Sequence, residues 1–260
     1  MDKRKVIVFI IEGPTDETYI RALWEKFDNL NNTYKIEFIT AHDLTSNLRY
    51  KPNTIKKTII DLIDRRIIQA RGYSWKGSAN SIERIVHLTD TDGAYIPPEN
   101  ILKKEGAAIK GDISYTEDYI SSGSIDKVIQ RNNHKRKNLA VLINPHPEKN
   151  KKPYQLNEVP YHVFYMSCNI DHVFWGKEYM SIDGSEKWKK SGEFESMAQG
   201  ATNTQEFLTE TVFNPEYAYQ VDLNLDDVEN YEKSWEFIQQ GTNSLKRFTN
   251  LNLFFRKYLN

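Results

Sequence analysis

Apolar residues in the first ninety positions form short continuous runs that alternate with stripes of helical spacing. Lys5–Ile11 (KVIVFII) is a continuous apolar run, typical of a strand covered on both faces. It is followed by Thr15, a residue type that caps helices, and by apolar residues every three or four positions as far as Phe27, which predicts a helix. The same patterns predict a strand, a helix and a third strand: Tyr34–Thr40, Thr54–Gln69 and the run of Ile85, Val86 and Leu88 before Asp90.

The order strand–helix–strand–helix–strand restricts how these strands can be arranged. Short crossovers through helices require parallel strands with right-handed connections. We therefore expect an α/β fold with a Rossmann-like, mostly parallel sheet flanked by helices. In such sheets the functional crevice lies at the carboxyl ends of the strands.

The pattern beyond Pro98 is less regular. We expect an irregular stretch to about Gly123, then a helix over Ile125–Arg136 and strands at Leu139–Ile143 and Tyr161–Met166. From Gly176 onward the pattern is helical and rich in aromatic residues, with these candidate helices: Ser185–Gly200, Thr204–Val212, Tyr231–Gln240 and Ser244–Leu259. We therefore predict an α/β domain over residues 1–175 and a helical C-terminal extension or cap over residues 176–260. The pattern does not decide whether that extension packs on the sheet.

Acidic residues follow two of the predicted strands. Glu12 comes after the first, and Asp90 and Asp92 follow the third, together with the turn residue Gly93. Because the carboxyl ends of parallel strands lie at one edge of a sheet, we expect the three carboxylates to meet. Gathered carboxylates repel one another unless a cation lies among them, and hard oxygen ligands suit Mg²⁺ or Mn²⁺. One or two such ions at this edge would support phosphodiester hydrolysis.

These residues carry a family resemblance. Strand–Glu12-Gly13-x-x-Asp16-Glu17–helix, followed by strand–Asp90-x-Asp92-Gly93, resembles the Toprim domain of topoisomerases, primases and several nucleases. Within that superfamily the chain is most similar to the OLD-like and RloB-like Toprim proteins of prokaryotic defence systems. Their later strand, followed by an acidic residue in an aromatic helix, is loosely matched by Ile170-Asp171-His172-Val173-Phe174-Trp175, with aspartate where glutamate is commoner. The resemblance covers roughly Lys5 to Trp175.

The resemblance implies a Mg²⁺- or Mn²⁺-dependent endonuclease that serves in antiphage defence. It implies that Glu12 is a metal ligand and general acid/base, that Asp90 and Asp92 bind metal in the catalytic site, and that Asp16 and Asp171 support a second ion. OLD nucleases carry an ATPase domain in the same chain, whereas this chain has no Gly-x-x-x-x-Gly-Lys-[Ser/Thr] phosphate loop. The resemblance therefore implies either a free-standing nuclease or an effector held by a separate ATPase or sensor subunit.

Charge does not select a partner by itself, because 35 basic residues are balanced by 36 acidic ones. Nucleic acid, whether DNA or RNA and including tRNA, would have to be bound by local basic patches. Two such patches are candidates: Lys135, Arg136 and Lys137 at the end of the predicted helix, and Lys149, Lys151 and Lys152 in the loop Asn144–Lys152. The first also fits the general preference of basic residues for helix C-termini.

Cysteine content and hydropathy indicate a cytoplasmic protein without membrane contact. Cys168 is the only cysteine, so no intrachain disulfide can form, which fits a reducing compartment. The apolar run after the basic start is too short for a signal peptide, and no segment approaches the roughly 20 apolar residues that span a bilayer. The assembly state is left open, a homo-oligomer included.

Two other functions remain open at this point. Strand–Asp90-x-Asp92-Gly93 also resembles the first motif of haloacid-dehalogenase-like phosphatases, in which the first aspartate attacks phosphorus and the second is the acid/base. That motif usually ends the first strand of its domain, and Glu12 would have no role in it. The chain could instead be a non-catalytic Toprim-like module that binds nucleic acid or a protein through exposed aromatic residues. The candidates are Trp175, Trp188, Tyr217, Tyr219 and Trp235.

Overall fold

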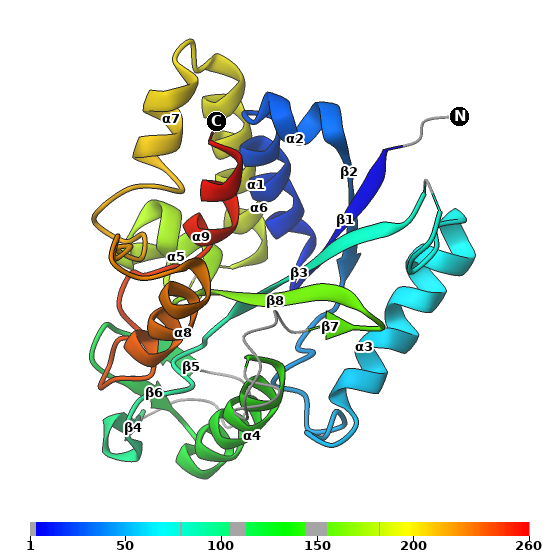
Figure 1. Cartoon of the computed structure of the whole chain (residues 1–260). Coiled ribbons are helices and arrows are strands. Elements are labelled where there is room, and N and C mark those ends of the chain that lie inside the picture. The colour runs from blue at the N-terminus through cyan, green and yellow to red at the C-terminus, as the bar shows by residue number, and fades with distance from the viewer. Residues whose placement is uncertain (1–3, 79, 105–112, 144–154, 182, 260) are drawn as a thin grey trace.

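The computed structural model describes residues 4–78, 80–104, 113–143, 155–181 and 183–259. Its centre is a mostly parallel five-stranded sheet in the order β2-β1-β3-β8-β7 (Figure 1). The strands are β1 (Lys5–Ile11), β2 (Tyr34–Thr40), β3 (Ile82–Asp90), β7 (Gln155–Leu156) and β8 (Val159–Met166). Strand β1 pairs in parallel with both β2 and β3, and β3 pairs in parallel with β8, while β7 is antiparallel to β8. The predicted α/β class and parallel crossovers are confirmed.

One face of the sheet is covered by helices from both ends of the chain. They are α1 (Pro14–Trp24), α2 (Asp28–Thr33), α5 (Ile170–Trp175), α6 (Gly184–Gly200), α7 (Thr204–Glu210) and α9 (Asn252–Phe255), with short 3₁₀ turns at Lys177–Tyr179 and Arg256–Tyr258. In β1 the alternate residues Ile7, Phe9 and Ile11 point into this layer. The Phe9 ring lies 5.4 Å from that of Phe254. The C-terminal region therefore packs on the sheet.

The opposite face is covered by α3 (Ile55–Ile63), its π-helical continuation Asp64–Gln69, α4 (Ile125–Ile143) and α8 (Asp227–Ile238). Val8 and Ile10 of β1 point into this second core, which includes Trp235 of α8. Because both faces of β1 are buried, its residues had to be continuously apolar. Figure 1 shows the sheet between these two helical layers.

Part of the stretch predicted to be irregular, residues 97–123, forms a small second sheet. Its strands are β4 (Ile101–Lys103), β5 (Ile113–Tyr115) and β6 (Ile120–Ser122), in the order β4-β6-β5, preceded by the 3₁₀ turn Pro98–Asn100. Ile101 and Ile120 share a small core with Val128 of α4 and with Leu245. This sheet supports α4 beside the carboxyl edge of the large sheet.

The strand predicted at Leu139–Ile143 is wrong, because those residues are the last turns of α4. Five apolar residues are too few for periodicity to separate a strand from a buried helical segment. In the structure Leu139 and Leu142 continue the buried face of the helix at three- and four-residue spacing from Val128, Asn132 and Lys135. The helix is therefore seven residues longer than the predicted Ile125–Arg136.

The helix predicted over Ser244–Leu259 is also largely wrong. Within it the structure has only α9 and the short 3₁₀ turn that follows. The preceding backbone bonds to the end of β8 instead: the Ser167 amide donates to Phe248 O over 2.9 Å, and Thr249 forms a bridge with Met166. Because those carbonyls pair with another segment, they do not form helical hydrogen bonds.

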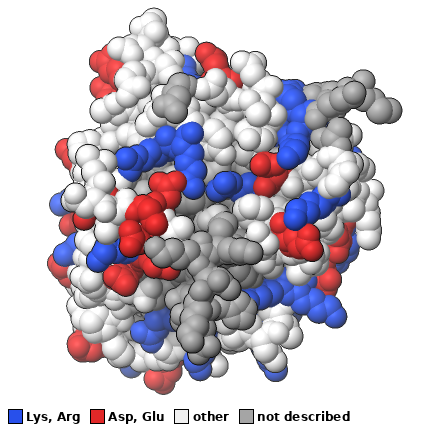
Figure 2. Space-filling view, viewed as in Figure 1, with Lys and Arg blue, Asp and Glu red and all other residues white. Residues whose placement is uncertain are grey.

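The surface carries both charge signs. On the face in Figure 2, basic and acidic side chains are intermixed, as the nearly equal numbers of the two kinds predict. In the part of the chain that the structure describes, no helix combines the length and the apolar character that crossing a bilayer requires.

Candidate active site

The carboxyl edge of the large sheet brings Glu12 and Asp90 together. Glu12 follows β1, Asp90 ends β3, and the two strands are parallel neighbours. Oε1 of Glu12 accepts a hydrogen bond from the Asp90 amide over 3.1 Å and another from Thr89 Oγ1 over 2.9 Å. Glu12 is therefore fixed to the strand whose tip carries the other two predicted carboxylates. Its pKa is raised, first by burial, with Lys135 opposing that effect and Asp92 adding to it.

Asp16 lies beside Glu12 because it closes the first turn of α1. Oδ2 of Asp16 accepts hydrogen bonds from the amides of Gly13, over 2.9 Å, and Glu12, over 3.1 Å. These are backbone donors that a helix start leaves without an intrahelical partner. Burial raises the pKa of Asp16 to about 7 despite the Gly13 amide, and the charge of Glu12 adds to the rise.

The turn after β3 holds Asp92 in a backbone conformation that few residue types adopt. Asp92 and Gly93 have φ angles of 49° and 64°. Thr91 Oγ1 donates to the carbonyl of Ser244 over 2.6 Å, so a hydrogen bond connects this turn to the C-terminal region. A Cβ added at Gly93 would lie 2.6 Å from Leu245 Cδ2, which explains why this position is glycine.

Three side chains of helix α4 form hydrogen bonds or an ion pair with the same turn. Lys135 Nζ donates to Asp92 Oδ2 over 2.6 Å and lies 3.4 Å from Glu12 Oε1. Arg131 Nη2 donates to the Asp92 carbonyl over 2.9 Å, and Asn132 Nδ2 to that of Gly93 over 3.2 Å. Burial by itself would raise the pKa of Asp92, but Lys135 and Arg131 outweigh it, and the pKa is lowered.

Asp171 lies in the first turn of α5, and its charge adds to the raised pKa of Asp16. Its Oδ1 accepts a 2.8 Å hydrogen bond from the hydroxyl of Tyr19, which in turn accepts one from Trp175 Nε1, also over 2.8 Å. The residue has no exposed surface, and its Oδ2 lacks a hydrogen-bond partner among the described residues. The pKa of Asp171 is raised, mainly by burial. A buried carboxylate oxygen without a donor is a ready ligand for a cation or a water molecule.

Lys187 of α6 faces the acidic residues from the C-terminal region. Burial by itself would lower its pKa, but the charges of Asp90, Asp171 and Asp16 raise it. The pKa of Asp90 is raised well above its ordinary value, first by burial and then by Glu12 and Asp16, with Lys187 opposing the rise. The ionised form of Asp90 is therefore disfavoured unless a further cation compensates it.

The cluster as a whole is short of positive charge. Among the described residues, the side chains whose charges interact here include five carboxyl groups and three cations: Glu12, Asp16, Asp90, Asp92 and Asp171 with Arg131, Lys135 and Lys187. The donor atoms of these carboxyl groups are the hard oxygens that Mg²⁺ prefers. Among the described residues, however, no three His, Cys, Asp or Glu side chains are grouped closely enough to enclose a metal ion. Mg²⁺ needs only one or two carboxylates, because it keeps several of its waters.

Comparison with protein-family models, with curated proteins and with solved structures gives no match to this chain. Its function is therefore inferred from the residues of the site.

The sequence identified the five carboxylates but not the cations that hold them. Lys135 was predicted to be a surface residue that contacts nucleic acid; that placement is wrong, because the side chain is fully buried and paired with Asp92. Lys135 lies three or four residues from Asn132, Asn138 and Leu139, a spacing that puts all four on one face of a helix. The prediction ended the helix at Arg136, so this face was not recognised. Lys187 gave no such signal, because nothing local places α6 beside the sheet.

Two of the other basic candidates, Arg136 and Lys137, are partly or fully exposed. Arg136 is half-buried and donates a hydrogen bond to Asn133, whereas Lys137 is exposed. Lys149, Lys151 and Lys152 lie outside the described residues. The role of these side chains in nucleic-acid binding stays a prediction.

The aromatic candidates differ in how far their side chains are exposed. Trp235 and Tyr217 are core residues with 2% and 1% exposure, whereas Trp188 of α6 is 57% exposed. Trp175 and Tyr219 are partly buried. Trp188 follows Lys187 in α6, and its part in binding nucleic acid or a protein stays a prediction. An indole exposed to this extent can stack on a base.

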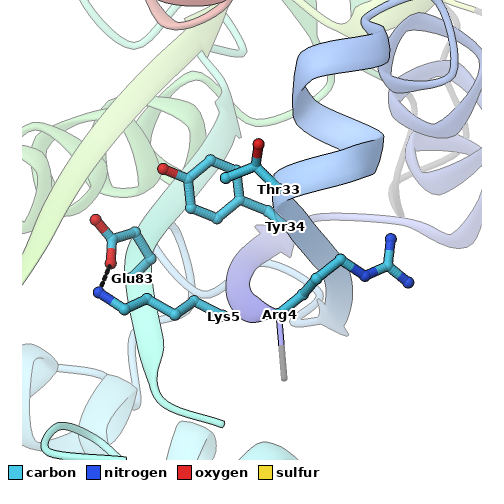
Figure 3. A pocket seen from close by; sticks show the side chains of 5 residues that line it. All are labelled: Arg4, Lys5, Thr33, Tyr34 and Glu83. Atoms are coloured by element: carbon cyan, nitrogen blue, oxygen red, sulfur yellow. Dashed lines mark hydrogen bonds and ion pairs between the residues drawn. The ribbon is translucent and has the colours of Figure 1, made fainter. Parts of the chain in front are cut away.

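A separate pocket lies at the other end of the sheet (Figure 3). It is lined by Arg4, Lys5, Thr33, Tyr34 and Glu83, and Lys5 Nζ donates to Glu83 Oε2 over 2.8 Å. Lys5 begins β1 and Glu12 follows its end, so at roughly 3.3 Å per residue the two are about 23 Å apart. This pocket is not part of the candidate active site.

Proposed function

We propose that the protein is a Toprim-type nuclease that hydrolyses nucleic-acid phosphodiesters with Mg²⁺ or Mn²⁺. The observation that carries the proposal is the hydrogen bond from the Asp90 amide to Glu12, over 3.1 Å, at the carboxyl edge of a parallel sheet. It joins the two motifs on which the family resemblance rests. A haloacid-dehalogenase-like phosphatase would give Glu12 no role. Here Glu12 also accepts a hydrogen bond from the hydroxyl of Thr89.

The donor set supports a metal-dependent reaction. The carboxylates of Glu12 and Asp90 would hold the ion, with Asp16, Asp92 and Asp171 around them. The raised pKa of Asp90 and the unpartnered Oδ2 of Asp171 both indicate a place where a cation would be stabilised. When bound, the ion supplies polarisation of the phosphodiester and neutralises charge on the leaving oxygen.

Glu12 is the best candidate for general acid/base. The hydrogen bonds that it accepts from described residues all go to Oε1. Oε2 is therefore the oxygen that can take a proton from an attacking water and return it to the leaving group. The raised pKa brings this carboxyl closer to neutral pH, where proton transfer is most effective. Lys187, half-buried at the cluster, is a cation that a substrate phosphate can approach.

The test compares the wild type with Glu12→Gln and with Glu17→Gln. Glu17 lies five residues further along, in the first turn of α1, and pairs with Arg21, so it is a matched control. The substrates are plasmid DNA, single-stranded DNA and total tRNA, each with Mg²⁺ and with Mn²⁺. We expect cleavage by the wild type and by Glu17→Gln, and a loss of about 100-fold or more in Glu12→Gln.

Three outcomes would contradict this expectation. Cleavage that Glu12→Gln leaves unchanged would remove Glu12 from the mechanism. Release of phosphate from a phosphomonoester by both the wild type and Glu12→Gln would favour the phosphatase. Nucleic-acid binding without cleavage in either metal would favour a non-catalytic module.

A role in antiphage defence, with a separate ATPase or sensor subunit, is proposed from the family resemblance alone. Its test is co-purification of the full-length chain with such a subunit, followed by the cleavage assay on the complex. Cleavage by the isolated chain at the same rate would argue against control by a partner.

A further inference from the structure

The acidic cluster has two sides that differ in how their charge is compensated. On the Asp92 side, Lys135 and Arg131 supply full positive charges, and Lys135 Nζ lies only 2.6 Å from the carboxylate. The Lys135 side chain has no exposed surface. An ammonium buried to this extent cannot leave without exposing a charge to the apolar interior or leaving Asp92 unpaired.

The Asp90 side lacks such a partner. Among the described residues, no lysine or arginine nitrogen forms an ion pair with Asp90 within 4.0 Å. Oε2 of Glu12 faces no described donor, and Oδ2 of the fully buried Asp171 is without one as well. The charge of Asp171 adds to the raised pKa of Asp16, the carboxylate that accepts from the Glu12 amide.

Resting on the proposed function, we propose that the site binds a single divalent cation on the Glu12–Asp90 side, and that the Lys135 ammonium takes the place of a second ion between Glu12 and Asp92. The ammonium already lies within 3.4 Å of both carboxylates. A second divalent cation there would be in contact with a fixed positive charge, and Coulomb repulsion would exclude it.

The experiment counts Mn²⁺ ions bound per chain, by the loss of the free Mn²⁺ signal in electron paramagnetic resonance. We expect one ion for the wild type, none for Asp90→Asn and one for Asp92→Asn. Lys135→Met keeps the length of the side chain but removes its charge, and it should bind two ions. Lys137→Met, an exposed lysine two residues further along the helix, is the matched control and should bind one.

The outcomes separate this inference from the proposed function. Two ions in the wild type, or no ion in Asp92→Asn, would overturn the single-ion site and leave a metal-dependent nuclease standing. No ion in the wild type would overturn the metal-dependent nuclease itself. If Lys135→Met does not fold, as circular dichroism would reveal, the contrast between Asp90→Asn and Asp92→Asn still decides the matter.

Discussion

Lys135 and Asp92 are 43 residues apart in the chain, yet the lysine ammonium lies 2.6 Å from the aspartate carboxylate. The pair ties α4 to the turn that follows β3. Because Lys135 is fully buried and Asp92 largely so, the interaction is strong and each partner depends on the other. It links the stability of the fold to the geometry of the candidate active site.

Lys135→Met should therefore destabilise the protein. We expect a loss of about 3 kcal/mol in the free energy of unfolding at pH 7, since Asp92 loses its partner. Urea denaturation measures this, with Lys137→Met expected to change stability by less than about 0.5 kcal/mol. Adding Asp92→Asn to Lys135→Met should recover part of the loss, whereas simple additivity of the two changes would show that the pair is not coupled.

Asp16→Asn should change how stability depends on pH. The folded protein holds the Asp16 proton up to about pH 7, whereas the unfolded chain releases it near its ordinary pKa of 3.8. Between these values the folded state binds more protons, so the contribution of Asp16 to stability falls as pH rises. Relative to the wild type, the metal-free variant should gain about 2 to 4 kcal/mol between pH 4 and pH 7. A difference that stays constant over this range would contradict the raised pKa.

Gly93→Ala should cost more than the backbone strain alone. Gly72 also has positive φ but has open space around it, so Gly72→Ala reports the strain, about 1 kcal/mol. Gly93→Ala adds the close contacts with Leu245 and Ile120, for about 2 to 4 kcal/mol in total. Thermal or urea unfolding compares the two variants. Leu245→Ala in the Gly93→Ala background should relieve part of the strain, and equal costs at the two glycines would refute the steric explanation.

Phe254→Ala tests whether the C-terminal region belongs to the core of the sheet. The Phe254 ring lies 5.4 Å from that of Phe9 and 6.1 Å from that of Phe164. We expect a loss of about 3 to 5 kcal/mol in a single cooperative transition. Leu259→Ala, at an exposed position, is the control and should have little effect. Two separate transitions in the wild type would instead indicate an independent C-terminal unit.

The sequence alone was sufficient for the four parallel strands of the central sheet, but it did not predict the short antiparallel strand β7. A run such as Lys5–Ile11 is typical of a strand covered on both faces, and short helical crossovers require parallel pairing. From that topology it followed that Glu12 would meet Asp90, because both residues come at the carboxyl ends of adjacent strands. These are properties of local pattern and of connection rules, which act over a few neighbouring elements.

The local pattern gave a wrong prediction where a segment is short, or where its backbone forms hydrogen bonds with a segment distant in the sequence. Leu139–Ile143 has too few residues to show a period. In the structure it continues α4, with Leu139 and Leu142 on the buried face of that helix. The Ser244–Thr249 segment has helical spacing, but its carbonyls bond to the end of β8. In both places a tertiary contact outweighed the local preference.

The sequence by itself thus determined the α/β class, the parallel central strands and the edge at which the carboxylates gather. Only the tertiary structure decided which cations face those carboxylates. A lysine is usually exposed, and nothing in the neighbours of Lys187 along the chain distinguishes it from a surface residue. The helical spacing around Lys135 was a signal only once α4 was known to continue to Ile143. The charges of both lysines are buried because α4 and α6 pack against the sheet edge, and the acidic side chains already there stabilise them.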